Sequence, residues 1–450
     1  MKKKLPALTI LVLAPLLVFC GQDFENAEFS ARRTKFMEQI PDGIAIILGA
    51  NTPPGDSHFF QTNDFYYFTG IEIPNAILII DGLNKESSIF FTLSEDGALG
   101  EGLPIELVRD PVKSTGIEKA YSLDRFSSIL TRLSMLNTLI YTPFKPGEIN
   151  RVNTNEKFNS LQRTMTMNTW DGRLTRELQF VKNIKDKFPH ITVKNCSPLI
   201  WNMRKIKSST EVNVLRRAAQ LGVEAHKELI KAAHPGVREK ELAALFTYTC
   251  MRKDAIDLAY NVIIMSGPNH AYGHYHIYDR TLEDGDFIIL DAGPDVGYYN
   301  ADVSTTFPAN GQFSPKQKEI YELAYGIYVT CLKNYRPGTT FKDIGNKVKE
   351  HLVANDFDPE ERRFRGFIRY GGYNHSIGMA THDPMGTFAG PEEVLQPGFV
   401  FACDINMPYA DKEMGIRIED TVVITQDGCE NLSQGLPRSL KEIESFMKKK

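Results

Sequence analysis

Short apolar runs recur through the first part of the chain. Between residues 43 and 143 they read GIAIILGA, DFYYFTG, NAILIIDG, SSIFFTL and TLIYTP, and they alternate with helical stretches such as residues 123–136. Runs of this length, bounded by turn residues and alternating with helical patterns, are typical of an α/β domain. The region has no phosphate-binding glycine loop and no cluster of histidines. We therefore expect it to position or oligomerise the protein rather than to catalyse a reaction.

A long amphipathic helix is predicted where this pattern ends. Ser208 followed by Glu211 is a capping box, and apolar residues then recur at helical spacing as far as Pro235-Gly236. This helix starts a second domain, so we expect an N-terminal domain at residues 25–195 and a second domain at residues 205–445. Two domains agree with a length of 450 residues, which is too long for one ordinary core.

The second domain repeats its own order of elements. A helix, Pro235-Gly236, a second helix and a strand pattern are followed by a helix ending near Tyr335, Pro337-Gly338 and a helix over residues 343–353. The recurrence predicts an internal duplication, in which a shared sheet would enclose a central cleft. The alternative is coincidence, since Pro-Gly often follows the end of a helix.

Acidic residues stand where apolar strands end in this domain. In IILDAGPDVGYYNADVSTTFP, residues 288–308, two strand patterns flank turn residues, so a hairpin would bring Asp291 and Asp302 together. Taken alone, the hairpin has a simpler interpretation, in which Asp291 caps the turn and Asp302 is solvated. Later strand patterns, however, also run into Asp404 and Glu419. Because an unpaired buried carboxylate is costly, four such acids in one core predict a pair of divalent cations.

These motifs resemble those of the pita-bread metallopeptidases, specifically the Xaa-Pro aminopeptidases (aminopeptidase P) and the related prolidases. FFQTNDFYYFTGIEIPNAILII also resembles the start of the aminopeptidase P N-terminal domain. The resemblance implies an α/β N-terminal domain followed by an α+β pita-bread (creatinase/aminopeptidase-like) catalytic domain with an internal pseudo-two-fold duplication. It also implies five metal ligands, which are Asp291, Asp302, His375 of YNHSIGMATHDPMG, Asp404 and Glu419.

The resemblance assigns roles to further residues. His274 and His382 match the family's substrate-side histidines and would donate hydrogen bonds to the scissile carbonyl. Asp404 would take the proton of the attacking water, and Arg417 would hold a carboxylate of the metal shell. Taken singly, His274 is as readily a surface or packing histidine, His382 a turn residue and Arg417 a cross-strand ion pair.

The ligand chemistry favours particular metals. An oxygen-rich set with one imidazole suits a hard ion, so we expect two divalent ions, with Mn²⁺ as the first choice and Co²⁺ or Zn²⁺ as substitutes. The sequence departs from the family pattern at three positions. Asp404 stands where most members have glutamate, Gly371 where many have a histidine, and Thr305 where an arginine is common.

The expected activity is release of the N-terminal residue from peptides with proline in the second position. The nearest alternative is a prolidase restricted to Xaa-Pro dipeptides, and the length of the N-terminal domain favours the aminopeptidase. An alternative of another class is a metal-deficient peptide-binding protein, for which Asp404 is the motivation. The remaining ligands and both histidines, present in order, favour the enzyme.

The N-terminus predicts export. MKKKLPALTILVLAPLLVFCGQ has a basic start and an apolar run from Leu5 to Phe19, which is shorter than the roughly twenty residues of a spanning helix. We expect a signal at residues 1–20, and an uncleaved signal anchor is the alternative. Cys20 resembles a bacterial lipoprotein acceptor cysteine, although Phe19 occupies a position that usually holds a small residue. The protein would then be periplasmic or a membrane-anchored lipoprotein.

Composition limits the remaining partners. A formal net charge of -4 gives no reason to expect nucleic acid as a partner. The six cysteines show no paired spacing, so we expect no disulfide framework, and we expect Cys196 and Cys403 to be small buried residues. The family resemblance implies peptide substrates and a homo-oligomer.

Overall fold

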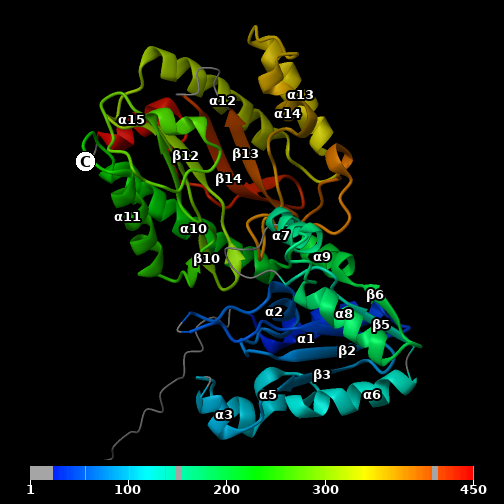
Figure 1. Ribbon diagram of the computed structural model, residues 1–450. Helices are drawn as coiled ribbons and strands as arrows, with labels where there is room; N and C mark the ends of the chain where they lie inside the picture. The colour runs from blue at the N-terminus through cyan, green and yellow to red at the C-terminus, as the bar shows by residue number, and fades with distance from the viewer. Residues whose placement is uncertain are drawn as a thin grey trace, which may run out of the picture.

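The computed structural model describes residues 24–448, except for residues 56, 101, 137, 148–154 and 408–413 and the side chains of residues 155–159. The expected signal at residues 1–20, with Cys20, lies outside the described residues. Within the described part of the chain, no helix is both long enough and apolar enough to span a bilayer. The chain forms two domains, with helix α9 (Ser197–Lys205) at their junction (Figure 1).

The N-terminal domain is built on a six-stranded mixed sheet of order β4-β3-β2-β1-β5-β6. Its elements are α1 (Asn26–Gln39), β1 (Ile44–Leu48), α2 (Asn63–Thr69), β2 (Ile77–Asp81), β3 (Glu86–Phe91), α3 (Glu95–Gly100), α4 (Glu106–Arg109), α5 (Pro111–Thr115), β4 (Lys119–Ser122), η1 (Leu123–Arg125), α6 (Phe126–Leu136), β5 (Leu139–Thr142), α7 (Asn155–Met167), α8 (Arg176–Lys187) and β6 (Thr192–Asn195).

Both faces of this sheet are covered, which explains why its central strands β1 and β2 are almost wholly apolar. Successive side chains of a strand point to opposite faces. Ile44 and Ile46 of β1 therefore pack with residues of α6 and α8. Ala45 and Ile47 belong to the core on the other face, which contains residues of α1 and α2.

One apolar run of the N-terminal domain is a helix rather than a strand. DFYYFTG, residues 64–70, lies in α2, which ends at Gly70 in the left-handed conformation. Every residue of α2 is buried, so the segment lacks the polar face that would reveal a helical period. A short, wholly apolar run cannot be assigned to helix or strand from periodicity.

The second domain contains a curved sheet of order β13-β14-β12-β9-β8, to which β15 is added at β14, and a small sheet of order β11-β10-β7. Its elements are α10 (Ser209–Ala232), α11 (Glu239–Met251), β7 (Asp257–Leu258), β8 (Ile263–Ser266), η2 (Gly267–Ala271), β9 (Phe287–Asp291), β10 (Pro294–Val296), β11 (Tyr299–Asn300), β12 (Ser304–Pro308), α12 (Pro315–Asn334), α13 (Phe341–Ala354), η3 (Arg362–Phe364), α14 (Arg365–Tyr370), η4 (Gly390–Glu392), β13 (Val400–Met407), β14 (Ile416–Ile424), β15 (Cys429–Asn431) and α15 (Leu440–Met447).

Local signals account for the start of this domain. Helix α10 begins at the predicted capping box, in which Ser208 accepts from Glu211 N and the Glu211 carboxylate accepts from Ser208 N. Its buried side includes Leu215, Ala219 and Leu229. The long helix expected from residue 208 onward is therefore confirmed.

The two Pro-Gly pairs occupy equivalent structural positions, which excludes coincidence. Gly236 N donates to Leu282 O at 2.8 Å, and Gly338 N donates to Leu395 O at 2.9 Å. Both glycines have positive φ, at 97° and 85°, a conformation that favours glycine. Each pair links two helices, α10 with α11 and α12 with α13, and strands of the curved sheet follow each helix pair. The expected internal duplication is therefore present.

The stretch 288–308 forms two nested hairpins instead of one. β9 and β12 pair antiparallel in the curved sheet, whereas β10 and β11 between them pair in the small sheet. The inner turn is Gly297-Tyr298, and both of its residues have positive φ. The second strand pattern of the expected hairpin is thus divided into β11 and β12, because the chain changes sheets between them.

Candidate metal centre

Strand register gathers the predicted ligands on one face of the curved sheet. Ser304 of β12 lies opposite Asp291 of β9 on one side and opposite Glu419 of β14 on the other. Glu419 in turn lies opposite Asp404 of β13. Directly opposed residues in a sheet project to the same face, so these four side chains form one row across four strands. All three acids of the row are buried.

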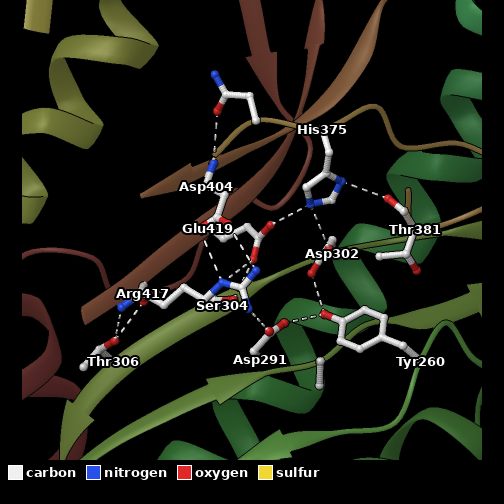
Figure 2. A network of polar contacts seen from close by, with 12 residues as sticks. Tyr260, Asp291, Asp302, Ser304, Thr306, His375, Thr381, Asp404, Arg417 and Glu419 are labelled. Atoms are coloured by element: carbon white, nitrogen blue, oxygen red, sulfur yellow. Dashed lines mark hydrogen bonds and ion pairs between the residues drawn. The ribbon is translucent and has the colours of Figure 1, made fainter. Parts of the chain in front are cut away.

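Asp302 joins this row from just before β12. Figure 2 shows the Tyr260 hydroxyl between Asp291 and Asp302, where it donates to Asp291 Oδ1 at 2.6 Å and also contacts Asp302 Oδ1. Ser304 Oγ donates to Glu419 Oε2 at 2.7 Å. Tyrosine and serine hydroxyls therefore fix the orientation of the carboxylates.

Arg417 lies between Asp291 on one side and Asp404 and Glu419 on the other, as their shared cation (Figure 2). It stands two residues before Glu419 on β14 and therefore shares its face. Its guanidinium contacts Asp291 Oδ2, lies 3.1 Å from Asp404 Oδ2 through Nη2, and lies 3.3 Å from Glu419 Oε2 through Nε. The arrangement is more than a single cross-strand ion pair, because three acids share one guanidinium.

His375 faces the acids from the loop between α14 and β13. Its Nδ1 is 3.0 Å from Thr381 O, so Nδ1 donates to that carbonyl, and in the neutral ring Nε2 keeps a lone pair. Nε2 lies 3.4 Å from Asp302 Oδ2 and 3.3 Å from Glu419 Oε1. The His382 ring stacks on the His375 ring with centroids 4.0 Å apart.

Two atoms at this site that could bind a metal ion have no hydrogen-bond partner in the part of the chain that the structure describes. Among the described residues, His375 Nε2 and Glu419 Oε1 are buried atoms without a hydrogen-bond partner. Two groups have ligand atoms within 4.8 Å of one another, and both contain Asp302. One group is Asp302, His375 and His382, and the other is Asp291, Asp302 and Glu419. These residues fit divalent ions, because converging lone pairs of oxygen and imidazole nitrogen are unfavourable without a cation.

The catalytic half of the chain matches a known family model. The model described as metallopeptidase family M24 matches residues 213–426, a range that contains all five predicted ligands. Residues 213–426 therefore belong to metallopeptidase family M24. A second model, described as the N-terminal domain of aminopeptidase P, matches residues 29–141. The protein is therefore a metallo-exopeptidase, and its family binds divalent metals.

Full-length relatives support the same assignment. The chain is 28% identical to an Xaa-Pro aminopeptidase of Escherichia coli, covering 94% of this chain and 98% of the relative. It is 27% identical to Xaa-Pro aminopeptidase 3 of Homo sapiens, covering 94% and 86%. An Escherichia coli aminopeptidase P solved in complex with substrate superposes with a TM-score of 0.76 at 27% identity, covering 95% and 99%. The α/β N-terminal domain and the pita-bread catalytic domain expected for this M24 protein are thus confirmed.

Burial governs the electrostatics of the M24 site. Desolvation, reinforced by Glu419 and Asp291, raises the pKa of Asp302 well above its usual value. Desolvation also raises the pKa of Asp404, to about 7, although Arg417 opposes it. At Glu419 desolvation is outweighed by Arg417, His375 and Ser304, so its pKa falls to about 2. The site therefore holds more buried acid than Arg417 alone neutralises, which favours divalent cations.

The structure brings together most, but not all, of the predicted site residues. Asp291, Asp302, His375, Asp404 and Glu419 converge, and Arg417 and His382 adjoin them. Within the described chain, neither of the two groups whose ligand atoms lie close enough to share a metal ion includes Asp404, whose carboxylate lies against Arg417. Neither group includes His274, which is exposed on the loop after η2.

Two departures from the family pattern have local explanations. Gly371 ends α14 with a φ of 73°, and a Cβ there would lie 2.6 Å from Ile344 Cγ2. A histidine would be strained at that backbone position. Thr305 Oγ1 lies 3.0 Å from Nδ1 of the fully buried His226, so a threonine at this position pairs with a histidine of α10.

Sequence reasoning missed Tyr260, Ser304 and Thr381. Tyr260 stands far from every acid of the site in the sequence, and only the fold brings its hydroxyl to Asp291 and Asp302. Ser304 could have been found, because it stands two residues after Asp302 and so shares its face in an extended chain. Thr381 contributes a backbone carbonyl, which carries no residue-specific signal.

Proposed function

We propose that this protein is an exported Xaa-Pro aminopeptidase that uses two divalent metal ions, with Mn²⁺ as the first choice. The observation that carries the proposal is a cluster of four buried acids, two of which face His375, while His375 Nε2 and the facing Glu419 Oε1 lack hydrogen-bond partners within the described chain. The relatives named Xaa-Pro aminopeptidase support the choice of peptide substrates with proline in the second position.

Asp302 would be shared between the two ions, since it belongs to both metal-sized groups. His375 and Glu419 would complete one position, and Asp291 would complete the other. Asp404 and Glu419 would add bridging ligands. Because the set is rich in oxygen, it suits Mn²⁺ better than Zn²⁺.

When bound, two such ions acidify water toward a pKa of about 7 and polarise the scissile carbonyl. The chain's own groups supply the remaining chemistry. Asp404 would accept the proton of the attacking water at its carboxylate. Arg417 would hold Asp291 and Asp404 in place, and Thr381 O would keep the His375 Nδ1 proton on the side away from the ions.

His382 and His274 would donate hydrogen bonds to the oxygen of the scissile carbonyl as negative charge develops there. His382 lies against the His375 ring, which is consistent with this role. His274 is exposed on its loop, so its loop would have to approach the peptide for His274 to contribute. A peptide bond before proline lacks an N–H, which is why a dedicated site is needed to cleave it.

The first test is metal content together with residue release. Protein loaded with Mn²⁺ should contain two ions per chain and should release the first residue from Xaa-Pro-Xaa peptides, but not from matched Xaa-Ala-Xaa peptides. His375→Ala should lose both properties, and the exposed His234→Ala should keep them. Cleavage of Xaa-Pro dipeptides alone would identify a prolidase. No metal and no release with Mn²⁺, Co²⁺ or Zn²⁺ would identify a peptide-binding protein.

Export, lipidation and oligomeric state form the remaining part of the proposal. Residues 1–20 read as a signal and Cys20 as an acceptor, so we infer a periplasmic or membrane-anchored lipoprotein. Metabolic labelling with a fatty acid should label the wild type and not Cys20→Ala. Sedimentation of the purified protein should give a homo-oligomer, and a monomer would refute that part of the proposal.

A further inference from the structure

The loop that holds His375 and His382 is closed on itself. His375 Nδ1 meets Thr381 O, and Asp383 N donates to Ser376 O at 2.9 Å. The turn packs so tightly that a Cβ on Gly378 would lie 2.4 Å from Asp383 Oδ2. The carboxylate of Asp383 therefore packs against the turn at Gly378, within the loop that carries both histidine rings. We call residues 375–383 the histidine loop.

Two buried cations hold Asp383 from outside the loop. Arg204 at the end of α9 lies 2.5 Å from Asp383 Oδ1 through Nη2. Lys207, just before α10, lies 3.1 Å from Asp383 Oδ2. The side chains of all three residues are 1% exposed. Ion pairs at this depth are strongly orienting, because a displaced charge would find no water to replace its partner.

The N-terminal domain supplies the fourth charge. Arg204 Nη1 lies 2.7 Å from Asp64 Oδ1, so one guanidinium bridges an acid of α2 and the acid of the histidine loop. The neighbouring Asn63 donates through Nδ2 to Met379 O at 2.8 Å. Helix α2 thus contacts the histidine loop both directly and through Arg204. With two acids and two cations, the set is balanced in charge.

We propose that the network of Asp64, Arg204, Asp383 and Lys207 is a positioning device through which the N-terminal domain fixes the histidine loop. This inference rests on the proposed function for the roles of His375 and His382. None of the four residues would touch the substrate or the metals. They act by fixing the positions of two rings. His375 would bind metal through its Nε2, and His382 would donate a hydrogen bond to the scissile carbonyl. The N-terminal domain is then a structural part of the active site.

The test compares two variants that each weaken the contact between the domains. Asp64→Asn keeps the shape of the side chain but removes its charge. Tyr298→Phe is the matched control, because it removes the Tyr298 hydroxyl, which accepts from Gln61 N at 2.9 Å and donates to Glu72 at 2.6 Å, and neither partner belongs to the histidine loop. Each variant is measured for Tm, for Co²⁺ binding by visible absorption, and for kcat and KM on an Xaa-Pro-Xaa peptide.

We expect Asp64→Asn to lower kcat and to weaken Co²⁺ binding by about 10-fold to 100-fold, as is usual when contacts behind a metal ligand are lost, with KM changing much less. The Co²⁺ absorption band should shift, since the geometry at His375 changes. Tyr298→Phe should lower Tm while keeping the wild-type kcat and Co²⁺ spectrum. Asp64→Glu, which restores the charge, should recover part of the loss.

The inference is overturned if Asp64→Asn lowers Tm but keeps the wild-type kcat, Co²⁺ affinity and spectrum, because the network would then only fasten the domains. If Asp64→Asn does not fold, Asn63→Ala, which removes the contact with Met379 O, decides by the same comparison. Co²⁺ titration requires no hydrolysis. A wild type that binds Co²⁺ but cleaves no peptide would refute the proposed function while the spectra still test the network.

Discussion

Asp295 predicts an unusual dependence of stability on pH. It lies in β10, is 2% exposed, and its Oδ1 has no hydrogen-bond partner within the described chain. Burial raises its pKa from 3.8 to about 8, opposed by the backbone N–H of Tyr298 and reinforced by the neighbouring acids Asp257 and Glu72. The folded protein therefore keeps Asp295 protonated at neutral pH, whereas the unfolded chain ionises it above pH 4.

The magnitude follows from proton linkage. Between the unfolded and folded pKa values the folded state binds one more proton, so stability falls as pH rises, by about 1.4 kcal/mol per pH unit. From about pH 5.5 to about pH 7.5, Asp295 should remove about 3 kcal/mol of unfolding free energy. Below the unfolded pKa, and above about 8, the contribution of Asp295 no longer changes with pH.

The assay is urea unfolding of metal-free protein at about pH 5.5, 6.5 and 7.5 for the wild type and Asp295→Asn. Because the two chains differ at one group, all other titrations cancel in the difference. We expect the variant to gain about 3 kcal/mol relative to the wild type across this range. The exposed Asp254→Asn should show no such trend. A difference for Asp295→Asn that does not vary with pH would mean that the carboxyl is ionised in the folded state, and would refute the reasoning.

Three further predictions concern the network and the metals. Arg204→Met leaves Asp64 and Asp383 buried without their shared cation and should cost about 3–5 kcal/mol in urea unfolding, whereas Arg109→Met, at an exposed pair with Glu95, should leave the unfolding midpoint close to that of the wild type. Gly378→Ala places a Cβ 2.4 Å from Asp383 Oδ2 and 2.9 Å from Lys207 Cε, so it should cost about 1–3 kcal/mol by overpacking, and an unchanged Tm would contradict this packing. Removing metal with a chelator should abolish peptide cleavage. Restoring Mn²⁺ to about 100 times its Kd should raise the free energy of unfolding by about 2.7 kcal/mol. Equal Tm values with and without Mn²⁺ would argue against the proposed metal centre.

Features that depend on neighbouring residues were predictable from the sequence. The capping box at Ser208 starts α10 because both partners lie within one turn. The strands β1, β2, β3 and β5 coincide with apolar runs because their side chains are buried on both faces of a covered sheet. The acids were recognisable because a buried acid requires compensation, although only Asp291 ends its strand, β9, whereas Asp404 and Glu419 lie within β13 and β14.

The tertiary structure alone decided which groups meet. Register across four strands places Asp291, Ser304, Glu419 and Asp404 in one row, and no local pattern fixes that register. Every residue of α2 is buried, so its sequence lacks the periodic polar face by which a helix is recognised, and only the structure identified this segment as a helix. Arg204 joins Asp64 to Asp383 across the domain boundary. The sequence by itself therefore determined the kinds of ligands and the local elements, since these depend on side-chain chemistry and short-range contacts. The contacts that orient the ligands depended on the fold, since they join residues far apart in the chain.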